Sequence, residues 1–392
     1  MAAERPEAPN GVLLSLMLAG LLAWLFLDAV SVAPNRLVAG TPYRAHEVVG
    51  VWLALLATLP MLAVMALAWR PNPRRLRLAL GLVVALLAAL PLWLAAAVSV
   101  LVDPSLPQAR LGIGAAPWLL LFLWLLVLLV LLELRTRLGL SRPQGWTLLL
   151  PVLAAWWLAL PSWLEPLALY REYQVRSDQF VAAIGYHLAL VGAAVGASLL
   201  LGGALALAMR CHAGLQRGGF AVLNFLQTIP SLALFGLLLA PLAWLSANVA
   251  WVKALGVSGI GWAPAWLALL AYSLLPMVRN TFVALEGVEA GVIESARGMG
   301  MNRRQVFWQV RLPLAVPVIL EGIRITTVQA IGLAAVAALI GAGGLGTFIF
   351  QGLGQAAMDL VLLGALPIIA LALLADALFG TLAERLRPGG AR

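Results

Sequence analysis

The chain has 392 residues but very little charge, because only 10% of them are Asp, Glu, Lys or Arg, against roughly 25% in soluble domains. Its single cysteine, Cys211, excludes an internal disulfide. Three scattered histidines, His46, His187 and His212, lack the four-ligand spacing of a structural zinc site. The one lysine, Lys253, is followed by alanine, so a Gly-x-x-x-x-Gly-Lys-Ser/Thr phosphate loop is absent. These scarcities exclude a disulfide scaffold, a zinc module and a P-loop enzyme.

Long apolar runs are what the chain has in abundance, since 63% of its residues are hydrophobic. Several runs reach the ~20 residues that cross a bilayer. They lack the alternating ten-residue pattern of a transmembrane barrel. We predict an all-α polytopic membrane protein of about ten transmembrane helices. The expected spans are 11–33, 48–69, 78–102, 113–134, 147–165, 180–209, 220–245, 262–284, 314–342 and 358–382.

The basic residues predict an orientation in the cell (inner) membrane. A net charge of +9 could indicate nucleic acid as a partner, but the basic residues flank apolar runs, as cytoplasmic loops do. With the N-terminus in the cytoplasm, 18 of the 25 basic residues fall on the cytoplasmic side and six outside. We therefore expect no nucleic-acid partner and place both termini in the cytoplasm.

The polar stretch 166–179 is the best candidate for a domain boundary, on the external side. It predicts an N-terminal membrane extension of about five helices over residues 1–170. A core of about five further helices follows over 171–392.

A second polar stretch, residues 286–313, interrupts the core on the cytoplasmic side and predicts two short amphipathic helices. In the first helix, the apolar face is expected to consist of Val288, Val292, Ala296 and Met299. Gly300 then ends that helix. Such a loop needs a surface to cover it, either a cytosolic partner or the membrane and the protein's own helices.

The second short helix carries its own start signal. Asn302 is the expected cap, and Gln305 is its capping-box partner three residues later. Met301 and Val306 occupy the hydrophobic-staple positions. Pro313 suits a chain break or the first turn of the next span.

Several residues of this loop form a recognisable pattern. Glu294-Ser295-Ala296, then Gly300, then Val310, Leu312 and Pro313 resemble the EAA loop of permeases from binding-protein-dependent ABC importers. The chain departs from that pattern at Ser295, where the family has Ala, and at Val310, where it has Ile. The resemblance implies that the loop docks on a separate ATPase subunit.

Three further segments resemble the permeases for osmoprotectants such as glycine betaine, choline and carnitine. They are Asn224–Ala233, Leu274–Thr281 and Ile340–Gly346. The similarity covers roughly 180–386. The first five spans look like the extended N-terminal region of some members, and no role is assigned to them.

The resemblance implies a transport subunit that is not an enzyme and binds no cofactor itself. Mg-ATP would be hydrolysed on partner ATPase subunits. An external substrate-binding protein would deliver the solute, and a second permease subunit, identical or homologous, would complete the pathway.

Polar groups within spans are candidates for the translocation path, because lipid disfavours them. Two groups qualify: Gln227, Thr228, Pro230 and Ser231, and, after the loop, Thr326, Thr327 and Gln329. Ordinary interhelical hydrogen bonding is the open alternative. Gly341, Gly343, Gly344 and Gly346 are candidates for an external gate, with a plain helix-end turn as the alternative.

Two charged residues in the ninth span, Glu321 and Arg324, are three positions apart and are expected to pair. A structural ion pair is favoured over a substrate contact. The rival function is an ion-coupled secondary transporter of a 5+5 type, since five plus five spans would invert the two halves. However, the first half shows no counterpart of the Gln-Thr-Ile-Pro segment or of the cytoplasmic loop.

Overall fold

The computed structural model describes residues 8–36, 38–134, 138–140 and 142–386. The chain divides into two compact units, Met1–Val175 and Arg176–Arg392, which are considered separately. Eight helices in the described residues are long and apolar enough to cross a membrane, and two apolar helices are shorter. The predicted fold class, a mostly helical polytopic membrane protein, is confirmed.

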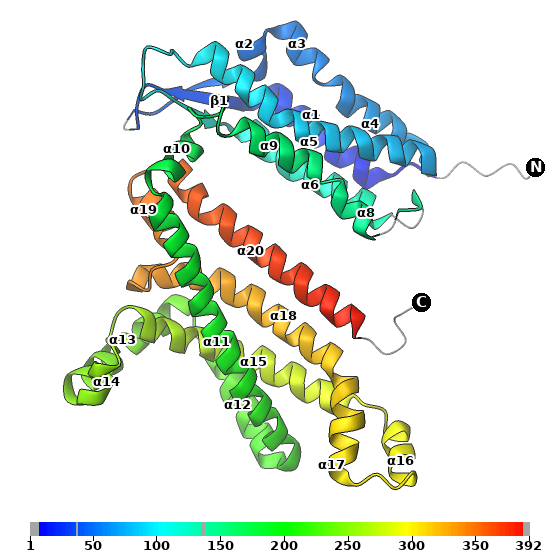
Figure 1. Cartoon of the computed structure of the whole chain (residues 1–392), viewed down its shortest axis with the longest axis vertical. Coiled ribbons are helices and arrows are strands. Elements are labelled where there is room, and N and C mark those ends of the chain that lie inside the picture. The colour runs from blue at the N-terminus through cyan, green and yellow to red at the C-terminus, as the bar shows by residue number, and fades with distance from the viewer. Residues whose placement is uncertain (1–7, 37, 135–137, 141, 387–392) are drawn as a thin grey trace, which may run out of the picture. The chain divides into compact units, whose positions relative to one another are not determined.

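The first unit is a helical bundle with a small sheet at one end (Figure 1). Within it α1 packs on α4 and α6, while α5 packs on α4, α6 and α9. Its helices are α1 (Gly11–Phe26), α2 (Ala45–Val49), α3 (Val51–Leu56), α4 (Leu59–Trp69), α5 (Pro73–Leu101), α6 (Ala115–Glu133), α8 (Arg142–Thr147), α9 (Leu150–Ala159) and α10 (Ala168–Val175).

The sheet was not expected from the sequence. Strands β1 (Asp28–Ala33), β2 (Thr41–Arg44) and β3 (Arg110–Ile113) pair antiparallel in the order β2-β1-β3. The predicted first span therefore ends at Phe26 rather than at residue 33. Val30 and Val32 favour extended backbone, and Pro34 disfavours helix at the residue before it. The fifth predicted span is also shorter than expected, because α9 ends at Ala159, two residues before Pro161.

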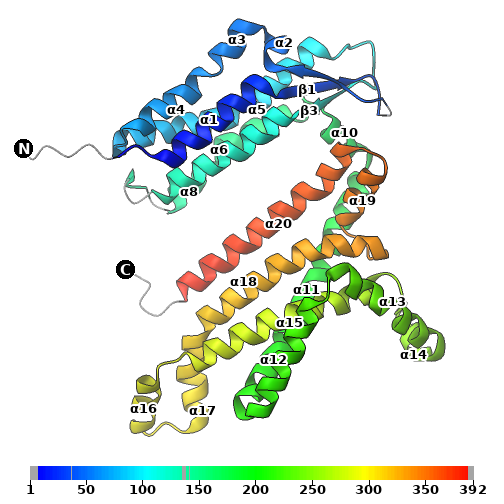
Figure 2. The same ribbon diagram turned by 180° about the vertical axis from the view of Figure 1, so that it is seen from behind.

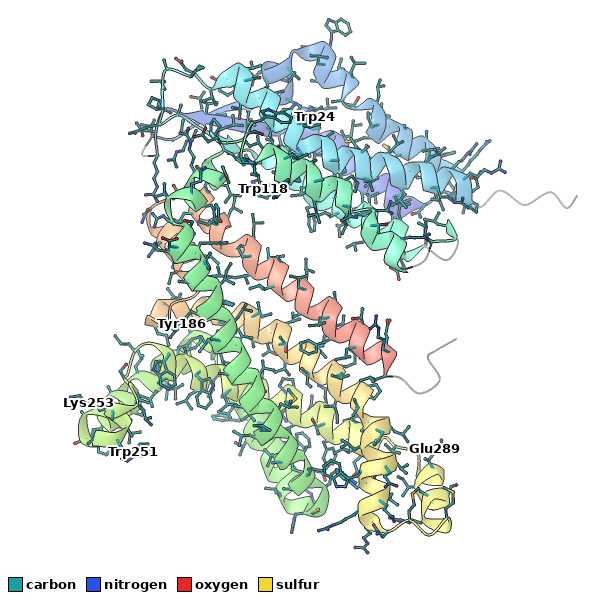
Figure 3. All side chains as sticks on the ribbon, in the orientation of Figure 1. Trp24, Trp118, Tyr186, Trp251, Lys253 and Glu289 are labelled. Atoms are coloured by element: carbon teal, nitrogen blue, oxygen red, sulfur yellow. The ribbon has the colours of Figure 1, made fainter. Side chains whose placement is uncertain are left out.

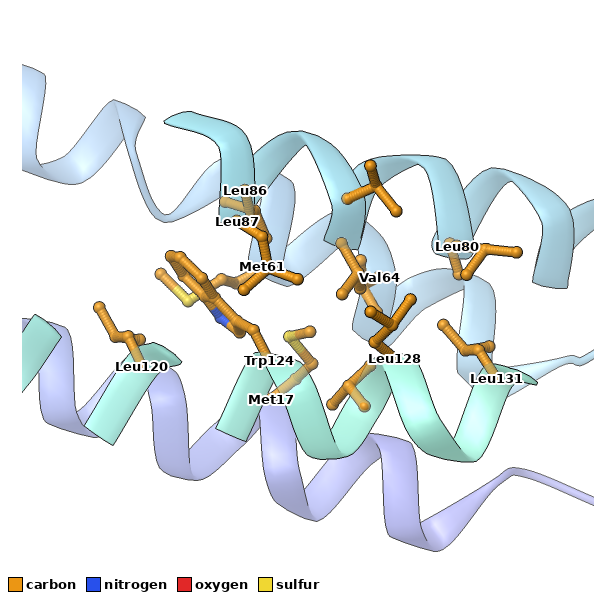
Figure 4. Close-up of a cluster of buried hydrophobic side chains, with 14 of the residues drawn as sticks. Met17, Met61, Val64, Leu80, Leu86, Leu87, Leu120, Trp124, Leu128 and Leu131 are labelled. Carbon is orange, nitrogen blue, oxygen red and sulfur yellow. The ribbon is translucent and has the colours of Figure 1, made fainter. Parts of the chain in front are cut away.

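The core of the first unit lies where α1, α4, α5 and α6 meet. Met17, Met61, Trp124 and Leu128 point into it from three of these helices (Figure 4). Gly20 lets α6 approach α1, since a Cβ there would lie 3.4 Å from Leu120 Cδ2. In lipid such close packing, rather than removal of apolar surface from water, holds helices together.

At the sheet end, a buried carboxylate joins three segments of the first unit. Glu172 on α10 is 4% exposed and pairs with Arg36 Nε at 2.9 Å and with Arg110 Nη1 at 3.0 Å. Arg171 donates to the Pro107 and Ala109 carbonyls at 2.9 and 2.8 Å. These contacts attach α10 to the loop before β3.

We expect Glu172→Gln to destabilise the first unit by about 2–3 kcal/mol, because Arg110 loses its charge partner in a buried place while Arg36 keeps some solvent. Thermal unfolding of the purified protein in detergent measures the loss. Glu165→Gln, a neighbouring carboxylate, is the control and should shift the midpoint little. Equal shifts for both variants would contradict this account.

In its described residues, the second unit contains five helical segments that are long and apolar enough to cross a membrane. Figures 1 and 2 show α18 between α15 and α20, with α11 packed across α15 and α18. The helices are α11 (Ser177–Cys211), α12 (Ala213–Thr228), α13 (Ser231–Asn248), α14 (Ala250–Ala254), α15 (Trp262–Glu286), α16 (Ala290–Gly298), α17 (Arg303–Gln305), the π segment η1 (Val306–Arg311), α18 (Leu312–Val336), the 3-10 turn η2 (Ala337–Ile340), α19 (Gly346–Gly354) and α20 (Met358–Arg385).

Two expectations for this unit need correction. The predicted span 220–245 is broken at Ile229–Pro230, so α12 and α13 are separate helices. The second loop helix is not separate from the next span, because α17, η1 and α18 form one continuous helix; Pro313 lies in the first turn of α18, which was one of its two expected positions. The π segment lies where Pro313 removes a helical hydrogen bond, and this wider turn accommodates the proline.

Candidate functional site

The polar loop between α15 and α18 folds into a compact helical hairpin. Helix α16 packs on η1 through a small cluster formed by Ile293, Ala296 and Val306, with Val288, Met301 and Val310 around it. The expected apolar stripe is thus partly wrong. Ile293 is buried, whereas Val292 and Met299 are 38% and 73% exposed.

The predicted start of the second helix is confirmed. Asn302 Oδ1 accepts from the Gln305 N–H at 2.9 Å, and Gln305 Oε1 accepts from the Asn302 N–H at 2.9 Å. Gly300, between the helices, has φ +84°, a left-handed value that side chains disfavour. Helix α16 ends at Gly298, just before this reversal, and the hairpin depends on the glycine.

Two mainly apolar grooves lie on the surface of the hairpin. One groove of about 420 Å³ is lined by residues including Val292, Ser295, Met299 and Val310. Another of about 400 Å³ lies between the end of α15, the start of the hairpin and α18, where Val288, Val292 and Val318 line it. Glu294 and Ser295 are exposed, and Ser295 Oγ donates to the Gly291 carbonyl at 2.8 Å. The serine at this position therefore satisfies its hydroxyl within the helix.

The remaining loop residues continue into the next span. Ala296 is buried under the hairpin, Val310 and Leu312 are half-buried, and Pro313 is exposed. Figure 3 shows Glu289, at the start of the hairpin, and Lys253, on α14, at opposite ends of the second unit. The lone lysine is therefore far from the loop.

The break between α12 and α13 is held by a reciprocal pair of hydrogen bonds to α15. Gln227 Nε2 donates to the Tyr272 carbonyl at 2.6 Å. The Tyr272 hydroxyl donates in return to the Ile229 carbonyl. Tyr272 is 8% exposed and belongs to the apolar core of this unit, whereas Gln227 and Ile229 are half-buried. We refer to these contacts as the Gln227–Tyr272 pair.

The other path candidates bond mainly within their own helices. Thr228 donates to the Phe225 carbonyl, and Thr326 and Thr327 donate to carbonyls four residues earlier, at 2.7–2.8 Å. Thr326 is fully buried, whereas Gln329 and Pro230 are exposed and Ser231 is half-buried. Helices α12 and α13 pack against α15. The structure thus brings Gln227 together with Tyr272 rather than with the threonines of α18.

The glycine-rich segment forms a tight turn between η2 and α19. Gly341, Gly343 and Gly344 have φ of +76°, +75° and +78°. A Cβ on Gly346 would lie 1.9 Å from the Ala335 carbonyl oxygen, so α19 begins directly against α18. The Gly261 N–H, just before α15, donates to the Ile340 carbonyl at 2.8 Å.

A buried histidine of α11 packs against this glycine turn. His187 on α11 is 1% exposed, and its Nε2 lies 3.1 Å from the Ile331 carbonyl oxygen. A Cβ on Gly344 would lie 3.2 Å from its Nδ1. Figure 3 labels the preceding residue, Tyr186, on the same helix, and its ring lies near Gly343.

The predicted ion pair in α18 is present, but a stronger partner was missed. Arg324 Nη1 lies 3.2 Å from Glu321 Oε2. Its Nε and Nη2 donate to the two carboxylate oxygens of Asp376 on α20, at 2.6 and 2.8 Å. Gly380 leaves room for the guanidinium, since a Cβ there would lie 3.4 Å from Nη1. The cluster is therefore a clamp between two helices.

Sequence reasoning also missed Tyr272. A usable signal existed, because Pro276 stands four residues later in the same span. A proline in a helix removes the hydrogen bond to the carbonyl four residues before it. That carbonyl belongs to Tyr272, and a polar side chain on a neighbouring helix was to be expected.

Comparisons with known proteins divide the chain in two. Residues 194–388 match the family described as binding-protein-dependent transport system inner membrane component. Residues 8–170 match the N-terminal domain of the ABC transporter permease YehY.

Curated relatives agree with this assignment. The osmoprotectant import permease protein OsmW of Salmonella typhimurium is 39% identical over 226 residues, which are 56% of this chain and 98% of OsmW. The carnitine transport permease protein OpuCB of Listeria monocytogenes is 42% identical over 44% of this chain and 71% of its own length. EgtU of Helicobacter pylori, an ergothioneine transport permease and binding protein, is 43% identical over 40% of this chain and 25% of EgtU.

Among solved structures, the inward-facing MetNI methionine ABC transporter aligns with 54% of this chain and 97% of its own, at 23% identity and TM-score 0.45. An amino acid ABC transporter aligns with 55% of this chain and 96% of its own, at 17% identity and TM-score 0.42.

The match over residues 194–388 and the 39% identity to nearly all of OsmW define the second unit as a permease of an ABC transporter. The chain belongs to the inner membrane components of binding-protein-dependent transport systems, with an N-terminal domain of the YehY type. The predicted family is confirmed, and the comparisons do not favour the secondary-transporter alternative.

Proposed function

We propose that this chain is the transmembrane subunit of an ATP-driven importer that takes up osmoprotectants, quaternary ammonium compounds such as glycine betaine, carnitine and choline. The named substrates of its relatives support this choice of solute. The observation that supports coupling to ATP hydrolysis is the α16–η1 hairpin, with its exposed apolar grooves and its left-handed Gly300. This hairpin is the proposed contact with an ATPase subunit, through Glu294, Ser295, Ala296, Gly300, Val310, Leu312 and Pro313.

ATP is proposed to be bound and hydrolysed by another polypeptide. The only lysine, Lys253, lacks the sequence context of a phosphate loop. The chain would bind no cofactor, and Mg-ATP would belong to the ATPase subunits. A second permease subunit, identical or homologous, and an external binding protein complete the proposed assembly.

The orientation follows from the excess of basic residues on one side. The hairpin and both termini lie in the cytoplasm in this arrangement, and α14 and the glycine turn lie outside. ATP binding would close the ATPase subunits and move the two hairpins toward one another. That movement would switch the path from inward-facing to outward-facing, and release of hydrolysis products would reverse it.

Within the membrane, the break at Ile229–Pro230 is the proposed element of the translocation path, with Gln227, Thr228, Pro230 and Ser231 around it. Thr326, Thr327 and Gln329 on α18 are the second proposed group. The glycine turn at Gly341, Gly343, Gly344 and Gly346 is the proposed external gate, because its left-handed residues adopt backbone conformations that other residues disfavour.

The experiment is reconstitution of the permease with candidate ATPase and binding proteins in vesicles. We expect uptake of labelled glycine betaine to require internal ATP and the binding protein, and to persist when ionophores collapse ion gradients. Carnitine, choline and ergothioneine, tested as competitors, define the solute. Full-rate uptake by the permease alone, driven by an ion gradient, would refute the proposal.

A further inference from the structure

Two backbone carbonyls, one in α15 and one at the break between α12 and α13, lack a helical hydrogen-bond donor. Pro276 inside α15 has no N–H, so the carbonyl of Tyr272 lacks its helical donor. Ile229 lies between α12 and α13 in extended conformation, so its carbonyl also lacks a helical donor. A buried carbonyl without a partner is costly, especially in lipid.

The Gln227–Tyr272 pair provides a hydrogen-bond donor for each of these two carbonyls. The Gln227 amide donates to the carbonyl that Pro276 orphans, and the Tyr272 hydroxyl donates to the carbonyl that the α12–α13 break orphans. Each helix therefore supplies the donor that the other lacks. If α15 moves relative to the break, both carbonyls lose their donors together.

Helix α15 also connects this pair to the docking hairpin. Tyr272 lies 14 residues before Glu286, the last residue of α15, a distance of about 21 Å along the axis. Glu286 is held by Arg210 Nε at 2.5 Å, and α16 begins four residues later. At its other end, the residue before α15, Gly261, donates to the Ile340 carbonyl beside the glycine turn.

We propose that the Gln227–Tyr272 pair transmits movement of the hairpin, through α15, to the break at Ile229–Pro230. This inference rests on the proposed function and deepens it, by naming the contact through which force from an ATPase reaches the path. Gln227 and Tyr272 are positioning residues in this scheme. They hold the break in register with α15 rather than bind the solute.

The test measures transport and ATP hydrolysis in the same vesicles and compares their ratio. Tyr272→Phe and Gln227→Leu each remove one donor. We expect both variants to assemble with the ATPase and to hydrolyse ATP, while solute moved per ATP falls about tenfold. Tyr43→Phe and Gln216→Leu are matched controls, since neither side chain has a hydrogen bond within the described residues, and their ratio should equal that of the unmodified protein.

A second substitution separates transmission from simple repair of the Tyr272 carbonyl. Pro276→Ala restores a backbone N–H that can donate to this carbonyl within α15. In Gln227→Leu/Pro276→Ala the carbonyl is satisfied again, so thermal stability should return toward that of the unmodified protein. The bond from the Gln227 side chain of α12 to α15 is still absent, and only the Tyr272 hydroxyl bond to the Ile229 carbonyl remains, so the transport ratio should stay low.

Recovery of both stability and the transport ratio in the double variant would overturn the proposal, because the pair would then serve stability alone. A normal ratio in both single variants would overturn it as well. These results differ from failure of the proposed function, in which the unmodified protein itself shows no ATP-dependent uptake.

Discussion

Gly300→Val is expected to abolish co-purification of the permease with its ATPase while leaving the spans inserted. A left-handed conformation costs an ordinary residue about 1–2 kcal/mol and costs a β-branched residue more. With φ +84° at this position, valine forces the α16–η1 hairpin to refold. The apolar surface that Val292 and Met299 present would then be lost. Affinity capture of the ATPase on tagged permease measures the effect.

Gly298→Val is the matched control for this substitution. Gly298 is the last residue of α16, and, like Gly300, it has no atom within 4 Å of a Cβ position. The two variants differ in backbone conformation rather than in available space. Retention of the ATPase by Gly298→Val, and by Gly300→Asn, is expected, because asparagine tolerates the left-handed region. Normal capture by Gly300→Val would remove the hairpin from the docking scheme.

Asp376→Leu is expected to be among the most destabilising single changes in the second unit, at about 2–4 kcal/mol. Arg324 would lose both of its short hydrogen bonds, at 2.6 and 2.8 Å, and retain Glu321 at 3.2 Å. Without Asp376, the positive charge of the guanidinium either remains uncompensated within the span or is exposed to water by separation of α18 from α20. Thermal unfolding in detergent, followed by loss of monodisperse protein, measures the shift.

The double variant Arg324→Leu/Asp376→Leu tests the cause of this loss. The Arg324 and Asp376 side chains are only partly buried, at 33% and 45% exposed, but they lie in apolar helices, and replacing such a pair by apolar residues removes both charges together. We therefore expect the double variant to recover most of the lost stability, and Glu321→Gln to have a small effect. Additive losses in the double variant would show that Asp376 acts through something other than Arg324.

How much could be anticipated from the sequence depended on whether a feature was local. The capping box of Asn302 and Gln305 was predicted correctly, because its partners are three residues apart and its chemistry is self-contained. The family was identified correctly because the loop pattern is also local. By contrast, the buried side of α16 was predicted only in part, since Ile293 faces η1 while Val292 faces outward.

Non-local partners were the main source of error. Glu321, three residues from Arg324, was found, whereas the stronger partner Asp376 lies 52 positions away. Tyr272 and Gln227 are 45 positions apart, and only their two prolines hint that they meet. The strand at 28–33 was absorbed into an apolar span, because its pairing partners come from two later loops.

The small sheet has a consequence for how the polypeptide is made. Its central strand β1 emerges first from the biosynthetic machinery, but the β3 partner is synthesised almost eighty residues later, and the Glu172 that locks Arg36 and Arg110 later still. An unpaired strand edge attracts other chains. Nascent chains that stop before residue 110 thus carry an open edge, so ribosome stalling inside α5 should produce aggregates that stalling after α10 does not.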